Sequence, residues 1–310
     1  MSGAASCLRP LLAAAALILS THAAGALLQA DVRTDDVDRF YRVYDATHGH
    51  PTAAQLQAQY LDPGSEALHQ FVHLRIGDAA KLADAIAKRP DDYAKARACL
   101  PALAKTRAQL PAVFARMAEI HPGSTFPPIT FLIGRDSTGG TTGPDGILVG
   151  LETMCHLDFM GADVGDRFTH IVAHELAHVQ QPASRVDAPA GATLLFQSLV
   201  EGGAEFVAEL TSGDVSYGHM RAWTRGKECT IEQAFRQDAL GTDVSRWLYN
   251  GFGTPDKPGD LAYWVGYRIA KAYYANAADK TRAVSDLLDV SNDNAADLLA
   301  RSGWTPQAGC

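Results

Sequence analysis

The spacing of hydrophobic and polar residues predicts helices along the first part of the chain. Between residues 27 and 120 nearly every stretch has helical periodicity, and Asp35–Tyr44 also carries acidic residues in its first turn. The alanine-rich stretch Asp91–Ile120 contains Pro101 and Pro111, which break or kink a helix. We therefore predict two or three packed helices there, within an N-terminal helical subdomain of residues 27–120.

The pattern becomes extended after residue 120. Ile129–Ile133 reads as a short apolar strand, Gly134–Gly146 as a glycine-rich loop of hairpin type, and Gly146–Glu152 as a second strand. The chain is therefore expected to be mainly α-helical with a small β-sheet, an α+β fold. Residues 121–310 form its second region.

Helices are predicted in this second region at Asp166–Gln180, Leu194–Leu210, Gly226–Leu248 and Asp260–Ala275, with a further helix after Asp279. The second of them carries Gly202 and Gly203 in its middle, and each glycine costs about 0.8–1.0 kcal/mol relative to alanine in a helix. A glycine pair is easiest to explain when another backbone passes close by. We expect that backbone to be Asp166–Gln180.

The first of these helices contains His174-Glu175-Leu176-Ala177-His178. Residues four apart on a helix are one turn apart and only ~40° round, so the imidazoles of His174 and His178 can share one metal ion. Glu175 is rotated away from them, so its carboxylate can reach a water molecule on the metal instead. Two zinc ligands and a general base on one turn are the chemistry of an H-E-x-x-H sequence. The alternative is a helix whose histidines are hydrogen-bonded within the core.

A third ligand is expected, because a catalytic zinc ion usually has three protein ligands and one position for water. Glu201 and Glu205 lie one turn apart on one helix face, so one can bind the metal while the other hydrogen-bonds a ligand histidine. His174-Glu-x-x-His178, about 22 further residues and then Glu201-Gly-Gly-Ala-Glu-Phe206 resemble the gluzincin metallopeptidases. The resemblance implies a zincin-like catalytic region at 121–310. It also implies one Zn²⁺ per chain, with His174, His178 and Glu201 as ligands and Glu205 supporting a histidine.

The wider pattern is similar to a bacterial family of predicted zinc-dependent proteases that is related to the gliding-motility lipoproteins. The similarity covers roughly residues 60–280 and includes Gly139–Glu152 and Tyr263–Ile269. In zincin-like enzymes a strand of the small sheet borders the cleft, and an extended peptide can add to such an edge. Gly146–Glu152 is therefore a candidate for holding substrate. A strand inside the sheet explains the same residues equally well.

Peptide hydrolysis through a tetrahedral intermediate needs a donor for the developing oxyanion. A tyrosine or a histidine often serves in zinc peptidases. Tyr263 and Tyr267, one turn apart, are the first candidates, and His219 is the third. Each can instead be a core residue with a satisfied polar group. In the expected reaction, zinc polarises the scissile carbonyl and lowers the pKa of a water molecule, and Glu175 takes the water proton.

The substrate is expected to be a peptide or protein, and two other functions are compatible with the ligands. One is a non-catalytic zinc-binding interaction protein, although such a site needs no base at Glu175. The other is a zinc hydrolase of a non-peptide amide. A G-x-M-E-N motif of the aminopeptidase type is absent from the sequence, which favours an endopeptidase slightly. Nothing in the sequence specifies an oligomeric state.

Charge and the N-terminus indicate where the protein acts. The formal net charge of −8, without a basic cluster, argues against a nucleic-acid partner. Arg9, the short apolar run Leu11–Leu19 and Ala24-Gly25-Ala26 predict a cleaved signal peptide of residues 1–26. The mature chain is then periplasmic or secreted and has no transmembrane segment. An uncleaved membrane anchor is the alternative.

The cysteines fit an oxidising compartment. The mature chain keeps four of them, which allows one or two disulfides in any of three connectivities. These four are Cys99, Cys155, Cys229 and Cys310. None forms a C-x-x-C pair, so they do not indicate a second metal site.

Overall fold

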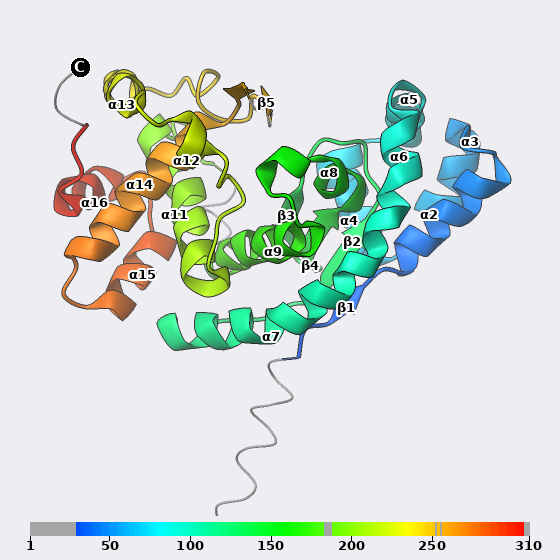
Figure 1. Ribbon diagram of the computed structural model, residues 1–310, viewed down its shortest axis with the longest axis horizontal. Helices are drawn as coiled ribbons and strands as arrows, with labels where there is room; N and C mark the ends of the chain where they lie inside the picture. Colours follow the sequence, from blue (N-terminus) through cyan, green and yellow to red (C-terminus); the bar gives the residue numbers. More distant parts are fainter. Residues whose placement is uncertain (1–28, 183–187, 252, 255, 307–310) are drawn as a thin grey trace, which may run out of the picture.

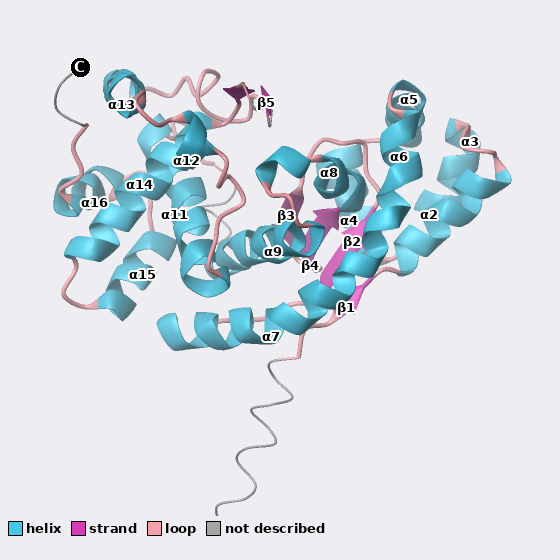
Figure 2. Cartoon of the chain, in the orientation of Figure 1, coloured by secondary structure: helices cyan, strands magenta, loops and turns pink. Residues whose placement is uncertain are grey.

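The computed structural model describes residues 29–182, 188–251, 253–254 and 256–306. The predicted signal peptide and Cys310 lie outside the described residues. The protein is mostly helical with small sheets, which confirms the α+β class (Figure 2). No helix among the described residues has the length and hydrophobicity needed to span a bilayer.

The elements follow the chain from one end of the molecule to the other, with the sheet and α9 between the N-terminal and C-terminal helices (Figure 1). The N-terminal helices are α2 (Asp35–Ala46), α3 (Ala53–Leu56), α4 (Glu66–Phe71), α5 (Ala79–Lys88), α6 (Pro90–Ala96) and α7 (Leu103–Ile120). The helices after the sheet are α8 (Leu151–His156), α9 (Val164–Gln180), α11 (Leu194–Ser212), α12 (Met220–Trp223), α13 (Glu228–Asp238), α14 (Leu261–Asn276), α15 (Lys280–Leu288) and α16 (Ala295–Ser302).

Shorter helical turns join several of these helices. Gln57–Leu61 and Val72–Ile76 are π-helical, and Arg97–Ala102 and Asp158–Met160 are 3₁₀ turns. Pro101 lies in the 3₁₀ turn that separates α6 from α7, as its missing N–H requires. Helix α7, in contrast, continues through Pro111. The stretch Asp91–Ile120 therefore forms two helices.

The main sheet has the strand order β1-β2-β4-β3. Its strands are β1 (Val32–Arg33), β2 (Ile129–Leu132), β3 (Gly140–Gly143) and β4 (Gly146–Gly150). β1, β2 and β4 run parallel, and β3 is antiparallel to β4. A second, two-stranded sheet pairs β5 (Gly253–Thr254) with β6 (Lys257–Pro258).

The interior position of β4 decides between the two interpretations of residues 146–152. All five residues of β4 are buried between β2 and β3, so β4 offers no free edge to a peptide. It also ends at Gly150, because α8 begins at Leu151. The edge strand on that side of β4 is β3, within the stretch expected to be a loop.

The sheet and the N-terminal helices share one hydrophobic core. Buried residues from α2 to α7 pack with those of β2, β4 and α9, while α11 to α16 form most of a second cluster. Two buried tyrosines fix the end of β2: the Tyr60 hydroxyl donates to the Ile133 carbonyl at 2.7 Å, and the Tyr93 hydroxyl to the Gly134 carbonyl at 3.0 Å. The position of this strand end therefore depends on the N-terminal helices.

Helices α11 and α14 cross with their backbones in contact. A Cβ added at Gly202 would lie 2.1 Å from the Tyr267 nitrogen, and one at Gly266 would lie 1.8 Å from the Ser198 carbonyl oxygen. The expectation of a close backbone at Gly202 is confirmed, but the partner is α14, and the expected contact with α9 is wrong. Gly203 is unlike Gly202, because its nearest neighbour would be 3.7 Å away.

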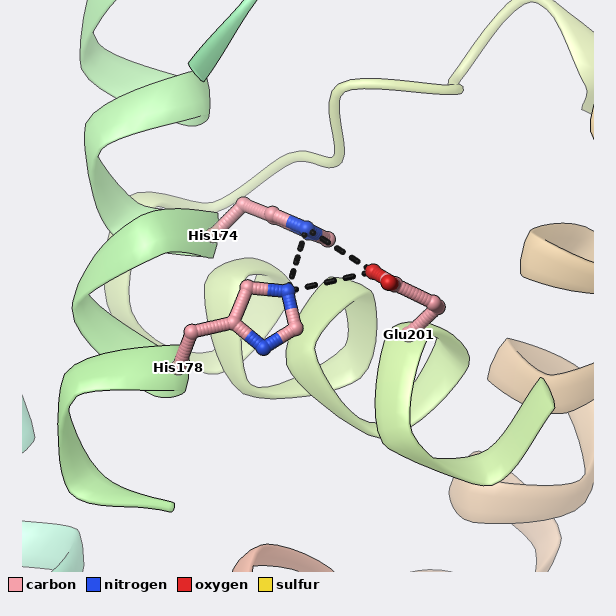
Figure 3. Close-up of side chains that lie close together, drawn as sticks. All are labelled: His174, His178 and Glu201. Atoms are coloured by element: carbon pink, nitrogen blue, oxygen red, sulfur yellow. Dashed lines mark hydrogen bonds and ion pairs between the residues drawn. The ribbon is translucent and has the colours of Figure 1, made fainter. Parts of the chain in front are cut away.

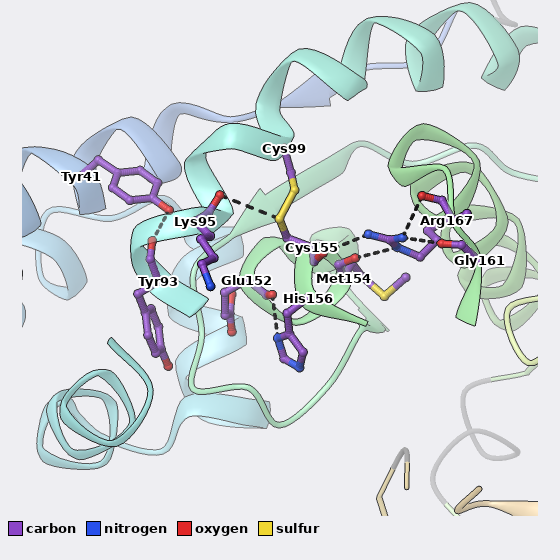
Figure 4. Close-up of a disulfide and its surroundings, with 11 residues drawn as sticks. Tyr41, Tyr93, Lys95, Cys99, Glu152, Met154, Cys155, His156, Gly161 and Arg167 are labelled. Carbon is purple, nitrogen blue, oxygen red and sulfur yellow. Dashed lines mark hydrogen bonds between the residues drawn. A yellow bond between two sulfur atoms is a disulfide. The ribbon is translucent and has the colours of Figure 1, made fainter. Parts of the chain in front are cut away.

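A disulfide between Cys99 and Cys155 joins the turn after α6 to α8 (Figure 4). It selects one of the possible partners of Cys99 and ties the N-terminal helices to the segment that directly follows β4. Cys229 is disulfide-bonded as well.

Removing this cross-link should destabilise the fold. The two cysteines are 56 residues apart, and closing a loop of that size stabilises a protein by about 2–4 kcal/mol. Equilibrium unfolding of a Cys99→Ser, Cys155→Ser variant in urea should show this loss against the parent protein. Labelling of both cysteines by a thiol reagent in the native parent would contradict the prediction.

Candidate metal centre

Helices α9 and α11 bring the three predicted metal ligands together (Figure 3). The Nε2 atoms of His174 and His178 are 2.9 Å apart, and Glu201 Oε2 lies 3.1 Å from that of His178 and 3.5 Å from that of His174. In a tetrahedral zinc site with bonds of about 2.0–2.2 Å, neighbouring ligand atoms are about 3.3–3.5 Å apart. The three atoms are thus within a few tenths of an ångström of a zinc-binding arrangement, and their donor types suit that ion.

The other nitrogen of each histidine has its own partner. Glu205 Oε1 lies 2.9 Å from His174 Nδ1, and Gln181 Oε1 lies 2.8 Å from His178 Nδ1. The Gln181 side chain also donates to the Val200 carbonyl of α11 at 3.1 Å. Such contacts fix ring orientation and leave Nε2 free for a metal. Gln181 was not predicted, although its place three residues after His178 was visible in the sequence.

Charge within the cluster favours a bound cation. Burial alone would lower the histidine pKa values, but Glu205 and Glu201 raise that of His174 well above its usual value, and Glu201 raises that of His178. Burial would raise the pKa of Glu201, yet the charge of His178 and hydrogen bonds from both histidines hold it well below its usual range. The carboxylates therefore favour a positive charge at this position, and a zinc ion bound there would take the place of protons.

Glu175 lies beside the ligands and against the edge strand. Its side chain is buried, and this burial raises the pKa of its carboxyl group despite the opposing charges of His178 and His174. A Cβ added at Gly140 of β3 would lie 2.6 Å from Glu175 Oε1. The absence of a side chain at Gly140 thus makes room for this carboxylate next to the outer edge of the sheet.

The three candidates for the oxyanion donor lie in different surroundings. The ring of Tyr263 stacks on His174 with a centroid distance of 6.0 Å, so Tyr263 borders the metal cluster. The Tyr267 hydroxyl instead donates to Glu209 at 2.8 Å and accepts from Lys271 at 2.9 Å. The Tyr267 hydroxyl is therefore hydrogen-bonded to side chains of α11 and α14 that lie outside the metal cluster.

His219 does not contact the cluster directly. Its ring packs against Phe159 and Tyr217, and Tyr217 in turn packs on Tyr263 at 4.6 Å. Two tyrosine rings therefore stand between His219 and His174. Burial lowers the pKa of His219, with Glu205 as the opposing charge.

Sequence reasoning missed Tyr249. This residue has a left-handed backbone conformation with φ 57°, and its hydroxyl lies 3.5 Å from Glu201 Oε1, the oxygen that does not face the histidines. The residue as a whole is 60% exposed, so it lies on the solvent side of the cluster. No local motif marks it, because its contact spans 48 residues of sequence.

A buried acidic residue, Asp260, is hydrogen-bonded to Asn250, the residue that follows Tyr249. Its carboxylate accepts from the Asn250 backbone and the Tyr217 hydroxyl, both at 3.1 Å. The Asn250 side chain in return accepts from the Asp260 nitrogen at 2.8 Å. These bonds join the two ends of the stretch that contains β5 and β6. Burial raises the pKa of Asp260 to about 6.

This raised pKa predicts a pH-dependent stability. The folded protein holds the Asp260 proton more tightly than the unfolded chain, so this group's contribution decreases as the pH rises from about 4 to 6, by at most about 3 kcal/mol. Asp260→Asn, which carries no charge at any pH, should gain stability relative to the parent over that interval. Urea unfolding of both metal-free proteins at pH 4, 5, 6 and 7 measures the difference. A constant difference would contradict the assignment.

Comparison with known proteins gives one match. Residues 134–294 match a family described as "Predicted Zn-dependent protease (DUF2268)". No curated protein and no solved structure matches the chain. The matched residues include β3, β4 and the helices that carry His174, His178 and Glu201. They make up just over half of the 310 residues, so the chain belongs to this family of predicted zinc-dependent proteases.

Proposed function

We propose that the protein is an exported zinc peptidase that hydrolyses peptide bonds with Glu175 as the general base. The observation that carries the proposal is the convergence of His174 Nε2, His178 Nε2 and Glu201 Oε2, with Glu175 on the same turn of α9. The family match supports the reaction class. The Cys99–Cys155 disulfide supports an oxidising compartment outside the cytoplasm.

His174, His178 and Glu201 would hold the zinc ion, and the ion would supply Lewis acidity for the scissile carbonyl and for a water molecule. The role of Glu175 is to take a proton from that water and pass it to the leaving amine. Its raised pKa suits this task, because a general base works best with a pKa near the working pH. Glu205 and Gln181 keep the two imidazoles oriented.

Tyr263 is our candidate for the oxyanion donor. It borders His174, and its hydroxyl makes no hydrogen bond to other described residues, so it is free to donate to substrate. Burial and then the charge of Glu201 raise its pKa well above the usual value, which keeps the hydroxyl protonated. Tyr249 has a separate task in this proposal, since its contact with Oε1 leaves Oε2 of Glu201 for the metal.

The outer edge of β3, where the Gly140 carbonyl already accepts a hydrogen bond from the Thr138 hydroxyl, offers a place for an extended substrate. The Gly150 nitrogen donates to the Gly139 carbonyl, so in this antiparallel pair the backbone groups of Gly140 and Thr142 point away from β4. A peptide can hydrogen-bond to such an edge as an added strand. Because Gly140 adjoins Glu175, this pairing would place a backbone amide of the substrate beside the proposed base.

Metal analysis combined with digestion of a casein substrate tests the proposal. The purified chain should contain about one zinc per molecule and should digest casein. A chelator should remove both zinc and activity, and added zinc should restore them. His178→Ala should lose both, because two ligands do not hold the ion. A parent protein that binds no zinc after reconstitution would refute the zinc site. One that binds zinc but cleaves no peptide would refute catalysis.

A further inference from the structure

Arg75 lies beside the proposed catalytic site but has no role in the reaction described above. It belongs to the π-helical turn Val72–Ile76 that extends α4 and ends at Gly77, which has φ 86°. The carbonyl of Arg75 accepts hydrogen bonds from Arg135 Nε at 2.9 Å and from the Ser137 hydroxyl at 3.0 Å. Its backbone is therefore fixed to the segment that leads from β2 to β3.

The Arg75 side chain is exposed and reaches the edge strand. Its Nη2 donates to Thr141 Oγ1 of β3 at 2.8 Å. No ion pair found among the described residues involves Arg75, although acidic residues outnumber basic ones in the chain, 35 to 27. Thr141 follows Gly140, which adjoins Glu175, so the guanidinium binds the strand next to the proposed base and has no carboxylate partner in the part of the chain that the structure describes.

Alternation along β3 determines which part of a substrate would meet this guanidinium. At Gly140 the Cβ position faces Glu175 and α9. At Thr141 the side chain faces Arg75, and at Gly143 the Cβ position faces Gln70 of α4. Paired strands keep the same alternation, so neighbouring residues of an added peptide point to opposite faces. If one residue of the added peptide faces Glu175, the next residue of that peptide would therefore project toward Arg75.

We propose that Arg75 binds a carboxylate of the substrate, and that the enzyme prefers peptides with an acidic group beside the scissile bond. This inference rests on the proposed peptidase function. An unpaired, always charged guanidinium with several fixed donors matches a carboxylate better than any other peptide group. The carboxylate belongs either to an aspartate or glutamate side chain or to the C-terminus of a short peptide. Both present the same chemistry to Arg75.

Peptide binding to a Glu175→Gln protein tests the inference apart from turnover. The probes are fluorescent peptide libraries in four forms, with glutamate or glutamine at each position in turn and with a free or an amidated C-terminus. Anisotropy should show about tenfold tighter binding of the carboxylate forms at low salt, which is the scale of a partly exposed charge-assisted pair. Higher salt should reduce this preference. The position and the terminus that matter identify the source of the carboxylate.

Arg75→Ala, added to the same protein, should remove the preference and leave the affinity for glutamine-containing, amidated peptides unchanged. Arg42→Ala is the matched control, because Arg42 is an exposed arginine on α2 with no contact to the site. A merely structural role for Arg75 would weaken binding of all peptides alike and would overturn the inference. Equal binding of charged and neutral peptides by the Glu175→Gln protein would also overturn the inference. The same holds if that protein binds none of the peptides.

The same peptides, given to the unmutated enzyme, separate the two proposals. Arg75-dependent binding without cleavage by the zinc-loaded parent supports carboxylate recognition and contradicts the peptidase function. Cleavage with no preference for a carboxylate supports the peptidase function and contradicts the role of Arg75. If both hold, Arg75→Ala should raise KM for acidic peptides about tenfold and leave kcat nearly unchanged.

Discussion

Replacing Glu175 by glutamine should lower kcat/KM for a peptide substrate by about 10²–10⁴-fold while zinc stays bound. Glutamine keeps the size of the side chain and its packing against Gly140, but it cannot accept the proton of the attacking water. The proposed metal ligands are His174, His178 and Glu201, so the zinc content should not change. Metal analysis and steady-state kinetics on the same preparations measure the two effects.

Glu209→Gln provides the matched control. Glu209 lies on α11 like Glu201, but its carboxylate pairs with Lys271 and Arg221 and not with the metal cluster. This variant should keep both zinc and activity. Full activity in Glu175→Gln would exclude Glu175 as the base. Loss of zinc in Glu175→Gln would mean that Glu175 takes part in binding the ion.

Gly266→Ala should destabilise the fold and separate two helices. The new methyl carbon would lie 1.8 Å from the Ser198 carbonyl oxygen, which belongs to a helix backbone and cannot rotate away. Helices α11 and α14 must then separate, at a cost of about 1–3 kcal/mol or more, and the better helix propensity of alanine returns less than about 1 kcal/mol. The Tm measured by calorimetry should fall by several degrees.

This separation should also weaken zinc binding. Glu201 is next to the crossing on α11, and Tyr263 lies one turn before it on α14. A competition assay with a zinc chelator should therefore report a lower affinity in Gly266→Ala. Gly203→Ala is the control, because its nearest neighbour would be 3.7 Å away, so it should keep the affinity and gain about 0.5–1 kcal/mol. Equal stability of both variants would show that the crossing is not tight.

Sequence alone could predict the parts of the site that depend on local geometry. The four-residue spacing of His174 and His178 places two imidazoles on one side of any helix, and the same spacing relates Glu201 to Glu205. Helical periodicity also identified the long helices α9, α11 and α14. Their functional roles are still predictions, but the convergence of the side chains is a feature of the structure.

The order of the strands could not be predicted in the same way. β3 has the sequence Gly-Thr-Thr-Gly, which lacks the apolar alternation of a strand and reads as a loop. Its pairing with β4 depends on the two-residue turn between Gly143 and Gly146. β1 is only two residues long and pairs with β2 across almost one hundred residues of sequence. No local pattern reports such a contact.

Contacts between distant segments were also beyond local reasoning. Gly202 required a neighbouring backbone, but only the packing of the second hydrophobic cluster brings α14 to it. Tyr249 reaches Glu201, and Arg75 reaches Thr141, across 48 and 66 residues. Patterns within a short stretch of sequence do not reveal such long-range contacts.

The two proposed functions, zinc binding and carboxylate recognition, lie on opposite faces of the main sheet. Helix α9 covers one face and carries two of the three proposed metal ligands, while α4 and its π-helical extension lie on the other. The segment shared with the family begins at residue 134, so it contains α9 but neither α4 nor Arg75. The proposed zinc chemistry therefore lies within the shared segment, whereas the proposed carboxylate preference lies in the helices that precede it.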